Sequence, residues 1–497
     1  MLWPALAVAA VLAVRWYGLA HASLPDYDSV RNWQIVGEVA RGDVHNLFRH
    51  GSPAFYLLYA PVAWLTTDYR VFQHLNAVVA VAALAALAQW VSRELAWRSW
   101  QTALLLLFAG SSVFLMFSGR DFTMGSVALL AFVGLLRAHF RRLHQPSLAA
   151  LLRAAAWLAV GLSVNYKFLL TLPILLLLEL LYGRGWQWQP AHLLQVLAVL
   201  AVPYLVLGAA GVWGGLPWHR WPAVYYNLVF PGATNAAGRA GHLRFDGLYY
   251  VRYLWQFESP LLWVGLLLGV GAWWKAGQKR TEAPPLPAYL AVWVGCFVVG
   301  MSLLLKAPRG LLLAYPLLYV LAFEGVRQAL ARRLKPRVAA GVLLGITLLA
   351  VAFNLRRVQR EIYAYSPTRY GQVAAWLHAQ HPGQSVRVAS TLSLGLAPFL
   401  HSQDTLVVLN NERELPRARQ LGCRYVLLDA AWRVLNAPHF DSLRRQPPLA
   451  AWPEPQLTAP LLFLEHSEYT GLGYRETLTL QRAAQQDSLQ LRLYRLP

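Results

Sequence analysis

Residues 70–91 read RVFQHLNAVVAVAALAALAQWV, an apolar run whose only charged residue stands at its start. A helix of about 20 mainly apolar residues is long enough to cross the hydrocarbon core of a bilayer. Ten further runs of this kind precede residue 355, so the sequence predicts eleven transmembrane helices. Their approximate bounds are 2–20, 70–91, 101–118, 122–138, 151–165, 168–182, 193–213, 259–274, 287–305, 309–324 and 338–354.

The composition agrees with a membrane protein. Of the 497 residues, 57% are hydrophobic and 13% are charged, against about 25% charged residues in soluble domains. The net charge of +21 would suggest a nucleic-acid partner in a soluble protein, but the basic residues lie between apolar runs, so we expect none. Cys296 and Cys423 are the only cysteines, which argues against a disulfide framework or a cysteine metal cluster.

The basic residues also predict the orientation, because short cytoplasmic loops collect lysine and arginine. With a cytoplasmic amino terminus, fifteen basic residues fall in cytoplasmic loops and four in short outer turns: Arg120, Lys167, Lys306 and Arg309. The short stretch 53–65 contains Pro61 and is interpreted as interfacial or re-entrant, because counting it as a span would reverse every later loop. Residues 1–22 are interpreted as a retained helix rather than a cleaved signal peptide, although Ala20-His21-Ala22 resembles a cleavage site.

Three regions then face outward: 21–69, 214–258 and the tail 355–497. The predicted fold class is an all-α polytopic membrane domain, residues 1–354, followed by a soluble α/β domain, residues 355–497. In the tail we expect helices at 368–380 and 413–420, the second of them in a βαβ-like unit. The expected strands are 386–389, 405–409, 425–428, 461–464 and 489–494.

Acidic residues gather at the outer face. The membrane part has twelve carboxylates, and eight of them lie at or beyond this face: Asp26, Asp28, Glu38, Asp43, Asp68, Asp121, Asp246 and Glu258. The positive-inside rule does not draw acids outward, so the clustering suggests an outward-facing site. The alternative for most of them is a solvated loop charge.

The first outer loop carries the strongest chemical signal. Asp26 and Asp28 follow the first span directly, beside an apolar wall that can raise a carboxyl pKa and suit it to general-base work. The same Asp-x-Asp pair could instead hold Mg²⁺ or Mn²⁺. Apolar residues at helical spacing over 30–41 predict an amphipathic interfacial helix, and His50-Gly51-Ser52-Pro53 follows it.

At these positions the chain resembles the GT-C superfamily of polytopic glycosyltransferases, which includes protein mannosyltransferases and lipid A aminoarabinose transferases. The resemblance covers residues 1–354. It rests on the order and spacing of Asp26-Tyr27-Asp28, His50-Gly51-Ser52-Pro53, Ser118-Gly119-Arg120-Asp121, Asn165-Tyr166-Lys167, Pro308-Arg309-Gly310 and Tyr315-Pro316.

The resemblance implies inverting transfer of a sugar from a polyprenyl-phosphate carrier. Asp28 would be the general base, with Asp26 as second choice and Asp121 orienting the acceptor or the base. Lys167 and Arg309, neither with an acidic neighbour in sequence, would stabilise the leaving phosphate; snorkelling to the interface is the alternative. The remaining candidates for substrate contacts are His50, Arg120, His242, Asp246 and Glu258.

The second outer loop is rich in aromatic side chains. These would stack on sugars or cover the lipid carrier, or they form the aromatic belt that is common at membrane interfaces. They are Trp218, Trp221, Tyr225, Tyr226, Phe230, Phe245, Tyr249, Tyr250, Tyr253 and Trp255.

Together these features predict a multi-pass glycosyltransferase of a bacterial inner membrane that works on the periplasmic side. Its partners would be a polyprenyl-phosphate-linked sugar and a glycan, lipid or protein acceptor. A transporter or flippase for a lipid-linked saccharide is the main rival. Transporters often show internal repeats and broken helices near the midplane, whereas here the polar groups gather at one face, which favours an enzyme. A third hypothesis is a non-catalytic membrane anchor for the tail, but it leaves the acids of the first loop unexplained.

Overall fold

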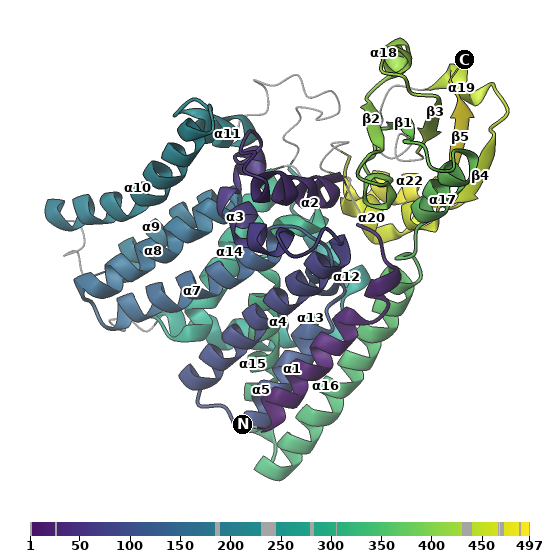
Figure 1. The fold of residues 1–497 in the computed structure, drawn as a ribbon. Coiled ribbons are helices and arrows are strands. Elements are labelled where there is room, and N and C mark those ends of the chain that lie inside the picture. The colour runs from purple at the N-terminus through teal and green to yellow at the C-terminus, as the bar shows by residue number, and fades with distance from the viewer. Residues whose placement is uncertain are drawn as a thin grey trace.

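The computed structural model describes residues 2–24, 27–183, 189–229, 245–278, 283–304, 306–429, 440–465, 467, 472–486 and 489–496. Its larger part is a body of helices, with the amino terminus at one end and the small sheet of the tail at the other (Figure 1). The helices of this body are α1 Leu2–Trp16, α2 Tyr27–Ala40, α3 Pro53–Ala63, α4 Tyr69–Glu94, α5 Ser99–Gly110, α6 Val113–Arg120, α7 Gly125–His144, α8 Leu148–Val164, α9 Thr171–Tyr182, α10 Pro190–Trp213, α11 Arg220–Val229, α12 Tyr249–Phe257, α13 Pro260–Gln278, α14 Leu286–Leu303, α15 Tyr315–Arg333 and α16 Pro336–Val358.

A helix lies within each of the eleven predicted spans. By length and composition, five helices of the described residues are able to cross a membrane, or six if the bent pair α5 and α6 forms one span. That pair is bent by 74° at two serines: Ser111 is the carboxyl-terminal cap of the first helix, and Ser112 caps the second with its side chain. The structure therefore supports a helical membrane body, and the number eleven stays a prediction.

The apolar surface agrees with a lipid environment. Helix α10 runs along the edge of the body (Figure 1), and Leu194, Leu197 and Leu205 on it are between 60% and 70% exposed. Soluble proteins rarely leave such a continuous apolar face uncovered.

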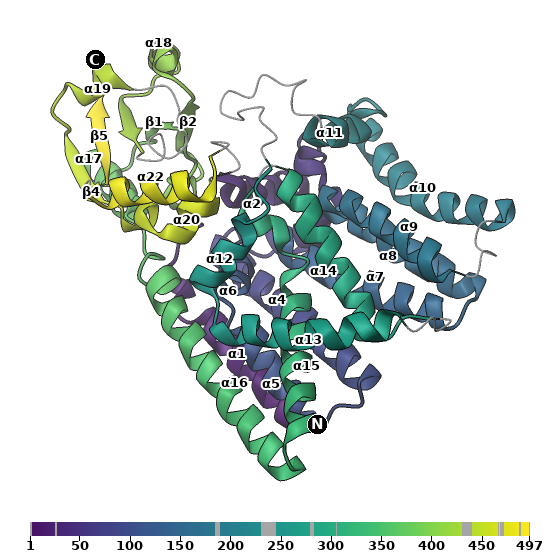
Figure 2. The same cartoon turned by 180° about the vertical axis from the view of Figure 1, so that it is seen from behind.

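Close helix contacts depend on glycine. At Gly325 on α15, an added Cβ would lie 2.1 Å from the backbone oxygen of Gly265 on α13. The two helices thus meet backbone to backbone, as small residues permit in membrane proteins. Helices α13 and α15 are seen next to each other in Figure 2.

The tail carries a five-stranded sheet in the order β2-β1-β3-β5-β4, with β1 parallel to β2 and β3, and β5 antiparallel to β3 and β4. The strands are β1 Arg387–Thr391, β2 Thr405–Leu409, β3 Tyr425–Leu428, β4 Ala450–Pro453 and β5 Gln490–Arg495; the helices are α17 Tyr370–Gln380, α18 Leu415–Gln420, α19 Asp441–Arg444, α20 Pro460–Glu465 and α22 Tyr474–Gln486. Side chains of α17 pack on one face of the sheet, and those of α18 and α19 on the other.

One predicted strand is wrong. Residues 461–464 belong to helix α20, which begins at Pro460. All four of these side chains are buried, so the run shows neither helical nor strand periodicity. Strand β4 was not predicted, because an edge strand that ends at Pro453 lacks the usual strand signal.

Candidate functional site

Asp28 lies in the first turn of α2, the amphipathic helix expected from the sequence. The amino end of a helix favours a negative charge there. One carboxylate oxygen lies 3.5 Å from Nε2 of His50, and the other lies 3.5 Å from Nη1 of Arg309. The Asp28 side chain keeps 28% of its surface exposed, so a substrate can reach it. Asp26, the other candidate base, lies outside the described residues.

His50 reaches Asp28 from a tight backbone turn. Its φ angle of 57° is left-handed, a conformation that is strained for a residue with a side chain and is found more often at functional sites. Its Nδ1 lies 3.4 Å from the hydroxyl of Tyr56, which also donates to Oδ1 of Asn32 on α2. The turn and the helix therefore hold the imidazole beside the carboxylate.

Arg309 lies in a short 3₁₀ helix, Pro308–Leu311, between α14 and α15. The next residue, Gly310, is closely packed: a Cβ there would lie 2.6 Å from the end of the Met301 side chain and 2.7 Å from the hydroxyl of Tyr250. Tyr250 in turn donates to the carbonyl of Ala307 at 3.3 Å. Close packing on both sides of Arg309 thus fixes the backbone from which its side chain reaches Asp28.

Lys167 joins this group through the backbone. It lies in the connection between α8 and α9, and its Nζ donates to the carbonyl oxygen of Arg309 at 3.1 Å. Burial, and then the nearby charge of Arg309, lower the pKa of Lys167 to about 8. The two cations predicted to bind phosphate are therefore adjacent, and Lys167 is in a position to lose its proton only slightly above neutral pH.

Glu465, the last residue of α20, completes the group. Its carboxylate accepts the backbone N–H of Arg309 at 3.2 Å and lies 3.4 Å from Nε of the same residue. No sequence pattern predicts this contact, because the partners are 156 residues apart and the apolar run before Glu465 resembles a strand. Arg309, which has no acidic neighbour in sequence, is thus held by two acids in space.

The tail docks on the same segment through further contacts. Tyr249 of α12 donates to the carbonyl of Leu464 at 3.1 Å, and Ser467 donates to the carbonyl of Lys306. Helix α20 consequently lies beside α2 and α12, at the end of the helical body away from the amino terminus (Figure 2).

Asp121 lies against the first turn of α2, the turn that also carries Asp28. It accepts a hydrogen bond from Ser29, the residue after Asp28, and its side chain is buried. The sequence placed it at the start of a helix, whereas the structure places it at the end of α6, four residues before α7 begins.

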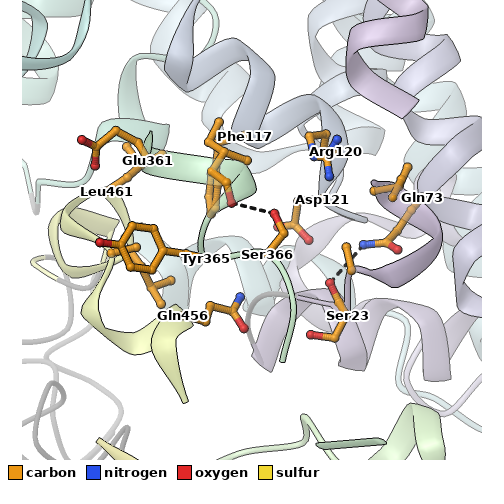
Figure 3. A pocket seen from close by; sticks show the side chains of 15 residues that line it. Ser23, Gln73, Phe117, Arg120, Asp121, Glu361, Tyr365, Ser366, Gln456 and Leu461 are labelled. Atoms are coloured by element: carbon orange, nitrogen blue, oxygen red, sulfur yellow. Dashed lines mark hydrogen bonds between the residues drawn. The ribbon is translucent and has the colours of Figure 1, made fainter. Parts of the chain in front are cut away.

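Arg120 binds the carboxyl end of a neighbouring helix. Its guanidinium donates to the carbonyls of Arg15 and Tyr17 at 2.7 and 2.6 Å, and so satisfies the carboxyl end of α1. It lines a small pocket with Asp121 between the helical body and the tail (Figure 3). This pocket has a volume of about 50 Å³, room for a few waters rather than for a sugar.

Two candidates of the second outer loop, Glu258 and Asp246, pair with side chains of nearby helices. Glu258 is buried, accepts a hydrogen bond from Ser112 at 2.8 Å and bonds the hydroxyl of Tyr319, so it joins helices. Asp246 lies 3.6 Å from Arg252. His242 lies outside the described residues.

The aromatic side chains of this loop divide into two groups. Tyr249, Tyr250 and Tyr253 are buried, and Tyr250 bonds the carbonyl of Ala307 near Arg309; burial leaves the three rings no free face for a sugar. Trp218 and Trp255 are exposed by 76% and 72%, as expected for an interfacial belt or a lid. Phe230 lies outside the described residues.

The Mg²⁺ or Mn²⁺ site at Asp26 and Asp28 stays a prediction, because Asp26 lies outside the described residues; beside Asp28 stand the imidazole of His50 and the guanidinium of Arg309. A guanidinium cannot act as a ligand. Within the described ranges, the His, Cys, Asp and Glu donors that converge lie in the tail instead.

No family model matches the chain, and no curated protein matches it. Several solved structures match it in fold. ArnT from Cupriavidus metallidurans in the apo state is 16% identical, with a TM-score of 0.58 over 91% of this chain and 96% of ArnT. The same protein bound to undecaprenyl phosphate gives 15% and 0.52 over the same shares.

The archaeal oligosaccharyltransferase AglB from Archaeoglobus fulgidus, in complex with an inhibitory peptide and a dolichol-phosphate, is 12% identical, with a TM-score of 0.54 over 86% of this chain and 70% of AglB. This chain therefore shares its fold with ArnT and AglB, and the resemblance noted from its motifs agrees with this likeness.

Proposed function

We propose that the protein transfers a sugar from a polyprenyl-phosphate carrier to an acceptor, with Asp28 as general base and inversion at the anomeric carbon. The observation that carries this proposal is the meeting of Asp28, Arg309 and Lys167, which are brought together from three distant segments. The fold supports it as well, because two neighbours bind lipid phosphates, undecaprenyl phosphate in one and a dolichol-phosphate in the other.

The chemistry needs a base and cations at one place. The acceptor oxygen attacks the anomeric carbon from the face opposite the phosphate, and Asp28 takes the acceptor proton. The bond between that carbon and the phosphate oxygen breaks, and its electron pair stays on the leaving carrier phosphate. Arg309 and Lys167 stabilise this charge, and His50 orients Asp28 from the other side.

Glu465 has a distinct part in this scheme. A carrier phosphate is an anion that binds guanidinium groups as a carboxylate does, and Glu465 already pairs with Arg309. We therefore expect the phosphate to replace Glu465, so that the tail releases Arg309 when the carrier binds and pairs with it again when the carrier leaves.

Orientation follows from the same scheme. Residues 1–354 would form the catalytic membrane domain, and residues 355–497 an extracytoplasmic domain placed over its outer face. The site would then open to the periplasm in a bacterium whose carrier is undecaprenyl phosphate. The acceptor would be a glycan, lipid or protein.

The test uses the full chain in nanodiscs with undecaprenyl phosphate linked to a radiolabelled hexose or pentose, together with envelope extract as acceptor. Asp28→Asn should lower the transfer rate by about 10²- to 10⁴-fold, as loss of a general base does, while binding of undecaprenyl phosphate is retained. Asp43→Asn is the matched control, because Asp43 lies in the same loop with half of its side chain exposed and pairs only locally with His45. Full activity of Asp28→Asn would remove this residue from its assigned role.

A transporter remains distinguishable by its product. In proteoliposomes, a flippase moves the sugar-lipid across the bilayer with its phosphate bond intact, whereas a transferase releases free carrier phosphate. Movement of intact sugar-lipid without any release would overturn the proposal.

A further inference from the structure

A cluster of metal-ligating side chains lies in the tail, away from the Asp28 site. His378 stands in the last turn of α17, and His401 and Asp404 lie in the turn that leads into β2. One donor atom from each residue lies within 4.8 Å of the other two. Nε2 of His378 is 2.8 Å from Oδ2 of Asp404, and Nδ1 of His401 is 3.9 Å from the same oxygen.

These separations suit a shared ion. Zinc binds histidine nitrogens and carboxylate oxygens at about 2.0–2.2 Å, which places the donors of a tetrahedral site roughly 3.4 Å apart. The two donor distances above fall on either side of that value. The two imidazole rings are stacked, with centroids 3.9 Å apart and planes within 4°. Because a ring nitrogen binds a metal in the plane of its ring, the two rings would tilt toward each other when all three donors bind one ion.

The carboxylate is already fixed in place. The side chain of Asp404 is fully buried, and its oxygens accept the backbone N–H groups of Val386 at 2.7 Å and of His401 at 2.8 Å. By contrast, 21% of the His378 side chain and 62% of the His401 side chain are exposed. The cluster thus has a rigid inner ligand and two outer ligands that solvent and ions can reach.

The surrounding electrostatics favour a cation as well. The last turn of a helix carries exposed carbonyl groups and a partial negative charge, and His378 belongs to this turn of α17. Together with the charge of Asp404, this environment offsets part of the ion's charge.

We propose that His378, His401 and Asp404 form a binding site for a divalent transition-metal ion such as Zn²⁺, with water as the fourth ligand. Two imidazoles and one carboxylate are typical ligands for zinc and its neighbours, whereas Mg²⁺ and Ca²⁺ require oxygen ligands. The ion would join the end of α17 to the start of β2, which is an edge strand of the sheet. It would therefore stabilise the tail and take no part in the chemistry at Asp28.

The test measures metal binding by the full chain in detergent after removal of any polyhistidine tag. Co²⁺ is titrated as a spectroscopic substitute, and Zn²⁺ affinity is measured by competition with a chromophoric chelator. We expect one ion per chain, with the visible absorption bands of a low-symmetry four-coordinate Co²⁺ site. His378→Ala, His401→Ala and Asp404→Asn should each weaken binding by at least about tenfold, because each removes a ligand.

His381→Ala is the matched control. His381 follows the same helix end, and its Nε2 lies 2.8 Å from the hydroxyl of Tyr425, outside the three-residue cluster. His401→Ala is the decisive variant, because its exposed side chain contributes little to folding. Unchanged affinity in His401→Ala, or equal loss in His381→Ala, would overturn the proposal, and neither result bears on sugar transfer.

Discussion

Replacing Glu465 with glutamine should tighten binding of the lipid carrier. The variant keeps a side-chain oxygen to accept the backbone N–H of Arg309 but removes the negative charge beside the guanidinium. At an effective dielectric constant of about 20, two unit charges 3.4 Å apart attract by about 5 kcal/mol. The carboxylate loses hydration when it is buried, and water at the partly exposed Arg309 screens the charges. The net attraction between Glu465 and Arg309 is therefore about 1.5 kcal/mol. A carrier that replaces Glu465 therefore gains about tenfold in affinity.

The assay is equilibrium binding of tritiated undecaprenyl phosphate to the chain in nanodiscs, at fixed ionic strength. Glu414→Gln serves as the control, since Glu414 bonds locally to Asn410 and Asn411 in the tail. Weaker or unchanged binding in Glu465→Gln would refute the idea that Glu465 and the carrier phosphate compete for Arg309. Equal tightening in Glu414→Gln would show that only the overall charge matters.

Two further results are expected. Carrier affinity should fall as the pH rises through about 8, because Lys167 is charged below its lowered pKa and neutral above it. Carrier binding is measured from pH 7 to 9.5, and this pH dependence should disappear in Lys167→Arg. A pH dependence that persists in the variant would assign it to another group. Gly265→Ala should lower the free energy of unfolding by about 1–3 kcal/mol or more, because its Cβ would lie 2.2 Å from the backbone oxygen of Ala322. Gly341→Ala, in open space on α16, should raise it by about 0.5–1 kcal/mol, so similar thermal unfolding midpoints for the two variants would contradict the packing described here.

Local patterns predicted the elements with the clearest periodicity. Apolar residues at helical spacing over 30–41 predicted α2, and strands β2 and β3 have the predicted bounds. Patterns failed where burial hides the period, as in α20, or where an edge strand ends in proline, as in β4. Predicted bounds also missed the bend between α5 and α6, because a span-length apolar run does not reveal where its helix breaks.

The candidate site was predicted only in part. Asp28, His50, Lys167 and Arg309 were each selected from their own short segment, and the structure brings them together. Asp121, Arg120 and Glu258 were selected by the same reasoning; Asp121 accepts from Ser29 beside Asp28, Arg120 donates to the end of α1, and Glu258 accepts from Ser112. A charged residue at a predicted membrane surface looks the same in sequence whether it serves a substrate or a helix end.

The sequence alone determined that this chain is a bundle of apolar helices with a mixed α/β tail, because hydrophobic length, charge asymmetry and residue periodicity act over a few turns of one segment. Only the tertiary structure decided which charges meet. The pairing of Arg309 with Asp28 and Glu465, and the convergence of two histidines on Asp404, depend on how distant segments pack. Electrostatic contacts act across space over a few ångströms, and such distances are set by the fold and not by separation along the chain.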